Sequence, residues 1–224
     1  TNATTTTTTA SQISNSGLRY FTYYGSAGWN DDLSDKLADH INLSWIVGLP
    51  GPDFASGIIN KAKNAKAHKL QALVDVGHIF FNDNDFCLRA DSSQRWIQFS
   101  QDIKDLVYDG TIIGFYPLDE PYAGEKLCNN KISIKERKQE LENIGFKIKQ
   151  TFSQTIVSTV FNVGTMIDKD FAVPVGYDWI GFDYYGCWND CSINPATAGW
   201  SWTSWYQLLK SKLDKNQKII LFLD

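Results

Sequence analysis

Short apolar segments rich in β-branched and aromatic residues alternate with amphipathic helical patterns from Leu18 onward. This alternation is typical of βαβ units built around a parallel sheet. Each apolar segment is too short and too continuously apolar to be a surface helix. We therefore expect seven strands, at Arg19–Gly25, Leu43–Leu49, Leu70–Val76, Ile112–Leu118, Thr155–Asn162, Trp179–Tyr185 and Lys218–Leu223.

The segments that connect these strands carry apolar residues at helical spacing. One such pattern runs over Phe54–Ala65 and a second over Trp96–Leu106. The longest helix is expected over Ser133–Phe152, because Ser133 and Glu136 form the sequence pattern of a capping box. These segments are expected to be the crossover helices between parallel strands.

Seven strands with helices after most of them predict a (β/α)8 TIM-type barrel, truncated after strand seven. The alternative is an open, doubly wound sheet, because a closed barrel needs its last strand for hydrogen bonding. Polar groups at the strand ends favour the barrel, and so does the lack of a glycine-rich phosphate loop after the first strand. We expect residues 1–16 to be a threonine-rich linker or disordered tail, and residues 17–224 to be the incomplete barrel.

Composition restricts the partners that such a chain is expected to have. The net charge is −4, and the basic residues lie mainly on predicted helices, so the basic stripe that nucleic acid requires is not expected. No apolar run approaches the ~20 residues needed to span a bilayer. We expect no nucleic-acid partner and no membrane association.

Four cysteines, Cys87, Cys128, Cys187 and Cys191, lie in segments that are expected to be loops. This placement suggests two disulfides, and the near pair Cys187 and Cys191 would leave Cys87 to join Cys128. Four cysteines permit three connectivities, and the sequence does not choose among them. A zinc site is the competing interpretation, disfavoured by the lack of a C-x-x-C pair. Oxidised cysteines indicate a secreted or extracellular protein.

Polar and aromatic side chains gather at the carboxyl ends of the predicted strands. They are Tyr23, Tyr24, Asp75, His78, Asp119, Glu120, Asn162, Asp183, Tyr184, Tyr185 and Asp224. Barrel enzymes place their catalytic groups at these strand ends. Aromatic residues make up 14% of the chain, and Trp188 lies in a loop after the sixth predicted strand. Acids surrounded by flat apolar rings suit a sugar, whose C–H faces stack on the rings while its hydroxyls bond to carboxylates.

The fourth predicted strand stops on two adjacent acids, Asp119 and Glu120. Cleavage of a glycosidic bond needs one acid to protonate the leaving oxygen and a second carboxylate as nucleophile or base. Neighbouring residues on a strand point to opposite faces, so these two acids are not expected to be that pair. Glu120 shares parity with Tyr116 and Leu118, and is the candidate acid if that parity faces the barrel axis.

On these residues the chain resembles the clan A glycoside hydrolases, (β/α)8 barrels whose fourth strand ends in Asn-Glu and whose seventh ends in a nucleophilic Glu. The resemblance implies that Glu120 is the acid/base and that Asp119 occupies the position of the preceding Asn. It also implies that Tyr184 or Tyr185 is the sixth-strand Tyr that bonds the nucleophile. The chain departs from the pattern at Asp119, which replaces an Asn, and at Asp224, which stands where a Glu is expected.

We therefore predict a secreted, monomeric glycoside hydrolase that cleaves a polysaccharide or oligosaccharide by carboxylate acid/base catalysis, without cofactor or metal. The catalytic candidates are Glu120, Asp224 and Asp183. The substrate-binding candidates are Asp119, Tyr24, Asp75, His78, Tyr116, Asn162, Tyr184, Tyr185 and Trp188. Two alternatives are a non-catalytic carbohydrate-binding barrel and a metal-assisted hydrolase, such as a deacetylase, that uses Asp75 and His78.

Overall fold

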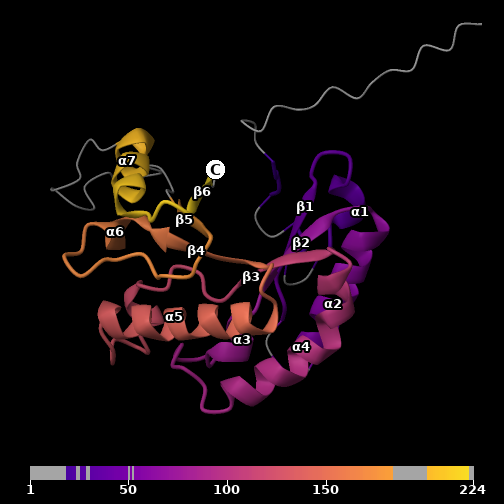
Figure 1. Ribbon diagram of the computed structural model, residues 1–224, viewed down its shortest axis with the longest axis horizontal. Helices are drawn as coiled ribbons and strands as arrows, with labels where there is room; N and C mark the ends of the chain where they lie inside the picture. Colours follow the sequence, from indigo (N-terminus) through magenta and orange to yellow (C-terminus); the bar gives the residue numbers. More distant parts are fainter. Residues whose placement is uncertain are drawn as a thin grey trace, which may run out of the picture.

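The structure, a computed structural model, describes residues 19–23, 26–28, 31–49, 51, 53–183 and 201–221. Within these ranges the chain forms a sheet of parallel strands that curls around a concave face (Figure 1). The strands are β1 (Leu43–Ile46), β2 (Gln71–Asp75), β3 (Ile112–Tyr116), β4 (Ile156–Asn162), β5 (Trp179–Asp183) and β6 (Lys218–Leu221). Each strand pairs in parallel with the next one in the chain.

The strand order decides between the two predicted architectures. Among the described strands the order in the sheet is β1-β2-β3-β4-β5-β6, the same as the order in the sequence. A doubly wound sheet reverses its order at a switch point, which this described sheet does not do. The doubly wound alternative is therefore wrong for this part of the chain, and the curled sheet is a half-barrel.

The first expected strand, Arg19–Gly25, is not a regular strand in its described part. Instead, the N–H of Phe21 donates to the side-chain oxygen of Asn42 at 2.8 Å, and the N–H of Asn42 donates to the carbonyl of Phe21 at 3.1 Å. Further along, Ala27 forms an isolated parallel bridge to Ile46 of β1. The segment thus lies alongside β1 as expected, but a side chain supplies part of the pairing.

The described helices are α1 (Ser34–Leu37), α2 (Phe54–Ala67), α3 (Gly77–Phe80), α4 (Ser92–Tyr108), α5 (Ile134–Thr151), α6 (Val163–Met166) and α7 (Trp202–Lys212), with a 3-10 turn, η1 (Gly124–Lys126). The three expected crossover helices are confirmed as α2, α4 and α5. At the start of α5, Ser133 and Glu136 form the predicted capping box, each side chain bonding to the other residue's backbone N–H. No described helix is both long and apolar enough to cross a membrane.

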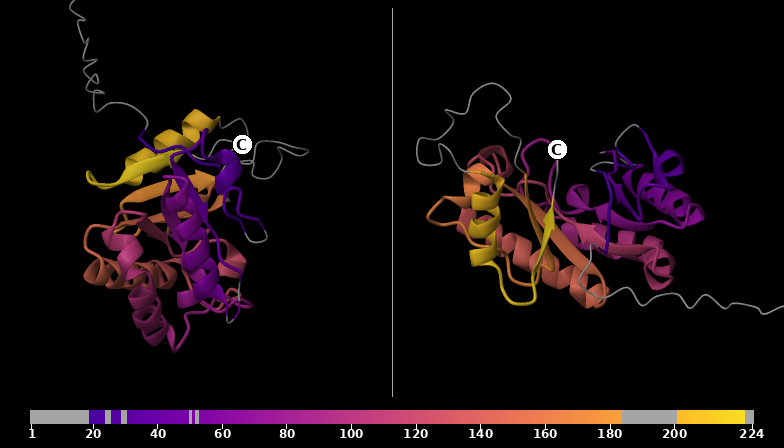
Figure 2. Two further views of the ribbon diagram at one scale, coloured as in Figure 1. Left: turned by 90° about the vertical axis from the view of Figure 1, so that its right-hand side faces the viewer. Right: turned by 90° about the horizontal axis from the view of Figure 1, so that it is seen from above.

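Two hydrophobic clusters lie on opposite faces of the sheet. The helices α2, α4 and α5 pack on the convex face (Figures 1 and 2). The concave face carries a smaller cluster whose buried members are Leu43, Trp45, Val47, Leu73, Tyr116 and Val160. Two aromatic rings of this cluster, Trp45 and Tyr116, meet edge to face with centroids 4.7 Å apart. The concave face is therefore a largely apolar packed floor, and acidic side chains lie at the carboxyl ends of its strands.

A glycine allows β3 to approach β4 closely. A Cβ atom on Gly114 would lie 2.8 Å from the Cβ and 2.8 Å from the carbonyl oxygen of Ile156. Such a contact is shorter than real Cβ atoms make, so a larger residue here would force the two strands apart. Gly114 thereby sets the spacing between the strands that carry the candidate site.

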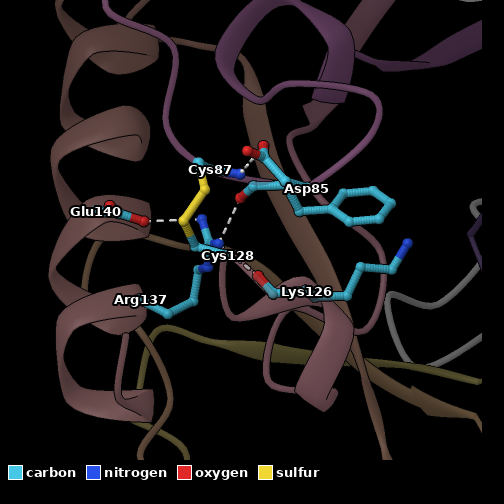
Figure 3. The surroundings of a disulfide bond; sticks show 7 residues. Asp85, Cys87, Lys126, Cys128, Arg137 and Glu140 are labelled. Carbon is cyan, nitrogen blue, oxygen red and sulfur yellow. Dashed lines mark hydrogen bonds and ion pairs between the residues drawn. A yellow bond between two sulfur atoms is a disulfide. The ribbon is translucent and has the colours of Figure 1, made fainter. Parts of the chain in front are cut away.

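A disulfide links the segments that follow β2 and β3. It joins Cys87, beyond α3, to Cys128, just beyond η1, across 41 residues of sequence (Figure 3). This pairing is one of the three connectivities that the sequence left open. Cys187 and Cys191 lie outside the described residues.

Candidate active site

The register of the parallel strands aligns polar residues at one edge of the sheet. Asp75, the last residue of β2, pairs with Tyr116, the last residue of β3. Asn162, the last residue of β4, pairs with Asp183, the last residue of β5. Between these pairs, Asp119 forms a parallel bridge to β4. Four neighbouring strands therefore end in polar side chains at the same level, at their carboxyl ends.

These side chains share the concave face of the sheet. Side chains alternate between the two faces along a strand, so Asp75 lies on the same face as Leu73, which belongs to the concave cluster. Asn162 likewise shares the face of Val160. Asp183 follows Phe182, which packs against the helices, and therefore lies on the opposite, concave face.

Asp119 joins this group through a hydrogen bond. Its carboxylate accepts a hydrogen bond from the hydroxyl of Tyr116, and that ring lies in the concave cluster. The bond positions the Asp119 carboxylate over the end of β3. Asp183 is buried, with 6% of its surface exposed, so it lies deeper in the group than the partly exposed Asp75 and Asp119.

Glu120 is held at the carboxyl ends of the strands by two hydrogen bonds to β4. Its N–H donates to the carbonyl of Val160 at 3.1 Å, and its carboxylate accepts a hydrogen bond of 3.0 Å from the side-chain amide of Asn162. Its φ of +44° is in the left-handed region, which an L residue with a side chain adopts only at a cost of about 1–3 kcal/mol. Burial raises the pKa of Glu120, the negative charge of Asp119 adds to this, and the Asn162 hydrogen bond opposes it.

The predicted shared parity of Tyr116, Leu118 and Glu120 is wrong. Tyr116 belongs to the concave cluster, whereas Leu118 packs in the cluster that contains the helices. The reason is that β3 ends at Tyr116, so the strict alternation of a strand does not continue to Glu120. The left-handed turn at Glu120 then directs its carboxylate to Asn162, a residue of concave parity.

The pKa of Asp75 is raised well above that of an ordinary carboxyl group. Burial raises its pKa to about 6, with a smaller upward effect from Asp119. The backbone N–H of Gly77 donates to its carboxylate at 2.7 Å, which opposes the rise, as do the charges of His78 and Lys126. A Cβ at Gly77 would lie 3.1 Å from the carboxylate, so a larger residue here would crowd this hydrogen bond. Asp75 can therefore hold or release a proton near pH 6.

His78 and Asp75 have different hydrogen-bond partners, and the substrate-binding role predicted for both stays a prediction. A ring nitrogen of His78 contacts the carboxylate of Asp83, while Asp75 bonds to the backbone of Gly77. Among the described residues, no three His, Cys, Asp or Glu side chains gather as metal ligands would.

Several candidates from the sequence lie outside the described residues. They are Tyr24, Tyr184, Tyr185, Trp188 and Asp224. Their roles stay predictions.

Sequence reasoning missed two features of this group. The hydrogen bond from the Asn162 amide to Glu120 was not expected, and the predicted substrate-binding role of Asn162 stays a prediction. Lys126 was not expected at all, yet its charge lowers the pKa of both Asp75 and Glu120. The possible pairing of Cys87 with Cys128 could have indicated the place of Lys126, because it puts the segment around Lys126 next to the segment that follows β2.

The half-barrel, with acidic side chains at the carboxyl ends of its strands, places the chain among the β/α proteins whose parallel strands lie in the sheet in the same order as in the sequence. Neither a protein-family model nor a curated protein matches the sequence. The fold is similar to that of an endo-1,4-β-mannanase from Rhizomucor miehei, with a TM-score of 0.54, 11% identity, and coverage of 84% of this chain and 70% of that one.

Two further solved structures are similar in fold. One is an exo-β-1,4-mannosidase from Opitutaceae bacterium strain TAV5, with a TM-score of 0.50 and 11% identity over 68% of this chain. The other is a chitinase from Rhizomucor miehei, with a TM-score of 0.50 and 13% identity over 81% of this chain. The chain spans only 34% of the mannosidase and 57% of the chitinase. The predicted resemblance to (β/α)8-barrel glycoside hydrolases is thereby confirmed at the level of the fold.

Proposed function

We propose that this chain is a glycoside hydrolase in which Glu120 is the general acid/base. The observation that carries the proposal is the place of Glu120: a partly buried carboxyl group with a raised pKa, at the carboxyl end of β3, bonded to Asn162. A proton donor to a glycosidic oxygen needs a pKa above that of an ordinary carboxyl group, so that it is protonated at working pH. Burial supplies that shift here.

The other acids of the rim offer the second carboxylate that the reaction requires. Asp183 is a candidate, and Asp224 is a second candidate from the sequence. In the proposed reaction Glu120 donates its proton to the leaving oxygen while the second carboxylate attacks the sugar or activates water. Asp75 and Asp119, on the concave face beside Tyr116, would then bond to sugar hydroxyls.

The proposal extends to the domain organisation, the partner, the location and the substrate of the protein. We propose that residues 17–224 form the first seven strands of a (β/α)8 barrel, preceded by a linker, and that a carbohydrate is the partner of a monomeric protein. The Cys87–Cys128 disulfide supports a secreted or extracellular location, because disulfides persist in oxidising compartments. The likeness in fold to a mannanase, a mannosidase and a chitinase makes β-1,4-mannan and chitin oligosaccharides the first substrates to test.

The test measures release of reducing ends from these substrates by the purified chain and by Glu120→Gln. We expect the variant to lose about 10²- to 10⁴-fold in turnover, the usual contribution of general acid–base catalysis, with an unchanged circular dichroism spectrum. Asp105→Asn is the control, because Asp105 is an exposed acid on α4 and not one of the residues of the candidate site. Near wild-type activity of Glu120→Gln would refute the assignment of the acid.

A further inference from the structure

Arg137 is a buried cation that bonds to two loops at once. It lies on α5 with its side chain fully buried, and it donates to the carbonyl of Phe86 at 2.6 Å and to the carbonyl of Lys126. Its other terminal nitrogen donates to Glu140 at 2.7 Å. Figure 3 shows Arg137 reaching from α5 toward the segments that carry the disulfide. The loop after α3 and the loop after β3 are thus fastened to one helix.

The disulfide fastens the same two loops covalently. Cys87 directly follows Phe86, and Cys128 lies two residues after Lys126. The backbone is left-handed at Phe86, with φ +52°, and at Cys128, with φ +55°. We call the disulfide and the Arg137 hydrogen bonds together the loop clamp. Since non-glycine residues adopt this backbone conformation only where surrounding contacts impose it, the clamp holds both loops in one arrangement.

The loop clamp determines where Lys126 lies. The Lys126 ammonium is 3.6 Å from the centre of the Phe86 ring, a cation–π contact between the two clamped loops. From there its charge reaches both Asp75 and Glu120, and it lowers the pKa of each.

Other charged groups also act on the two acids. His78 also lowers the pKa of Asp75, but its own ring contacts Asp83. Asp119 raises the pKa of both acids and Glu125 raises that of Glu120, because both are negatively charged.

We propose that Lys126 is a fixed positive charge of the candidate site, held by the Phe86 ring and the loop clamp between the loops that follow Asp75 and Glu120. The inference rests on the proposed function for its meaning in catalysis. Burial and the charge of Asp119 favour the protonated forms of Asp75 and Glu120, and the positive charge of Lys126 opposes both effects. It thereby lowers the pH at which Glu120 gives up its proton, against the larger effect of burial.

The test follows the carboxyl carbons of Asp75 and Glu120 by ¹³C NMR during a pH titration of the whole chain. Lys126→Met keeps the length of the side chain and removes its charge. We expect both midpoints to rise by about half a pH unit, the size of a Coulomb interaction over several ångströms of partly hydrated protein. Lys126→Arg restores the charge and should return both midpoints to near the wild-type values.

Lys131→Met is the matched control, because it removes a lysine from the same loop that is not among the charges acting on Asp75 or Glu120. Equal midpoints in wild type and Lys126→Met, or equal shifts in Lys126→Met and Lys131→Met, would overturn the inference. The titration needs no substrate, so this failure is distinct from a failure of the proposed hydrolase. If hydrolysis is observed, the limb on which kcat/KM falls with rising pH should move upward by the shift measured for Glu120.

Discussion

The side-chain amide of Asn162 donates a hydrogen bond of 3.0 Å to the carboxylate of Glu120. The carbonyl oxygen of the same side chain accepts the N–H of Gly164 at 2.8 Å and so caps α6. One residue therefore both starts a helix and stabilises the ionised form of the candidate acid. The orientation of the amide is determined from both sides, because its two ends have different partners.

Asn162→Asp separates these two roles. An aspartate keeps an acceptor for Gly164 but loses the donor to Glu120 and adds a negative charge next to it. We expect the pKa of Glu120 to rise further, because both changes disfavour its charged form. The carboxyl titration of Glu120 by NMR measures the shift. Asn143→Asp, on the exposed side of α5, is the control of equal charge, and an unshifted Glu120 in Asn162→Asp would contradict the assigned role.

Elements with a local signal were predictable from the sequence. Each described strand lies within an expected strand, because short apolar runs and helical spacing depend only on neighbouring residues. The Ser133–Glu136 capping box marked the start of α5 correctly for the same reason. At the N-terminal edge, Asn42 uses its side chain to pair with Phe21, and apolar patterning does not reveal such a bond.

The candidate site was predictable only in part. Strand ends identified Asp75, Asp119 and Asp183 because parallel strands finish at the same edge. The direction of the Glu120 side chain depends on a left-handed φ that glycine would signal but glutamate does not. The place of Lys126 depends on contacts between loops far apart in the sequence.

Asp75→Asn should change how stability depends on pH. The folded state raises the pKa of Asp75 from 3.8 to about 6, so the native protein binds a proton that the unfolded chain releases between about pH 4 and 6. Asp75 therefore lowers stability as pH rises through this window. The full effect, present above pH 6, is on the order of 3 kcal/mol.

Removing this charge should raise the thermal midpoint at pH 7 and leave it nearly unchanged at pH 3.5, where wild-type Asp75 is protonated. An asparagine oxygen can still accept the N–H of Gly77, so the local hydrogen bond is retained. Thermal unfolding followed by circular dichroism at both pH values measures the difference. Asp102→Asn, on the exposed side of α4, controls for charge, and an equal gain at both pH values would count against the raised pKa.

Arg137→Met should destabilise the protein strongly. The substitution leaves the carbonyls of Phe86 and Lys126 without this donor and leaves Glu140 without its buried cation. Breaking a buried charged network on one side costs about 3–5 kcal/mol. The free energy of unfolding in urea measures the loss.

Arg95→Met provides the matched comparison for Arg137→Met. Arg95 also forms an ion pair on a helix, with Asp91 at 3.3 Å, but the pair is exposed. Removing it should cost no more than about 1 kcal/mol. Similar losses in the two variants would show that the loop clamp contributes little to stability.

Two glycine substitutions should act in opposite directions. Gly114→Ala places a methyl group 2.8 Å from Ile156 and should destabilise the fold by about 1–3 kcal/mol through strain between β3 and β4. Gly57→Ala, within α2 and with nothing within 4 Å of the new methyl group, should stabilise it by about 0.5–1 kcal/mol. Denaturant unfolding of both variants tests the pair, and a stable Gly114→Ala would show that the two strands have room to move apart.

The chain-order arrangement of the strands gives each segment after a strand its own sector of the rim. The segment after β2 carries Cys87, the segment after β3 carries Lys126, and the segment after β4 begins at α6. An insertion in one such segment would lengthen a single sector of the rim and leave the neighbouring sectors in place. The sectors can thus be altered one at a time, except for the two that the Cys87–Cys128 disulfide joins.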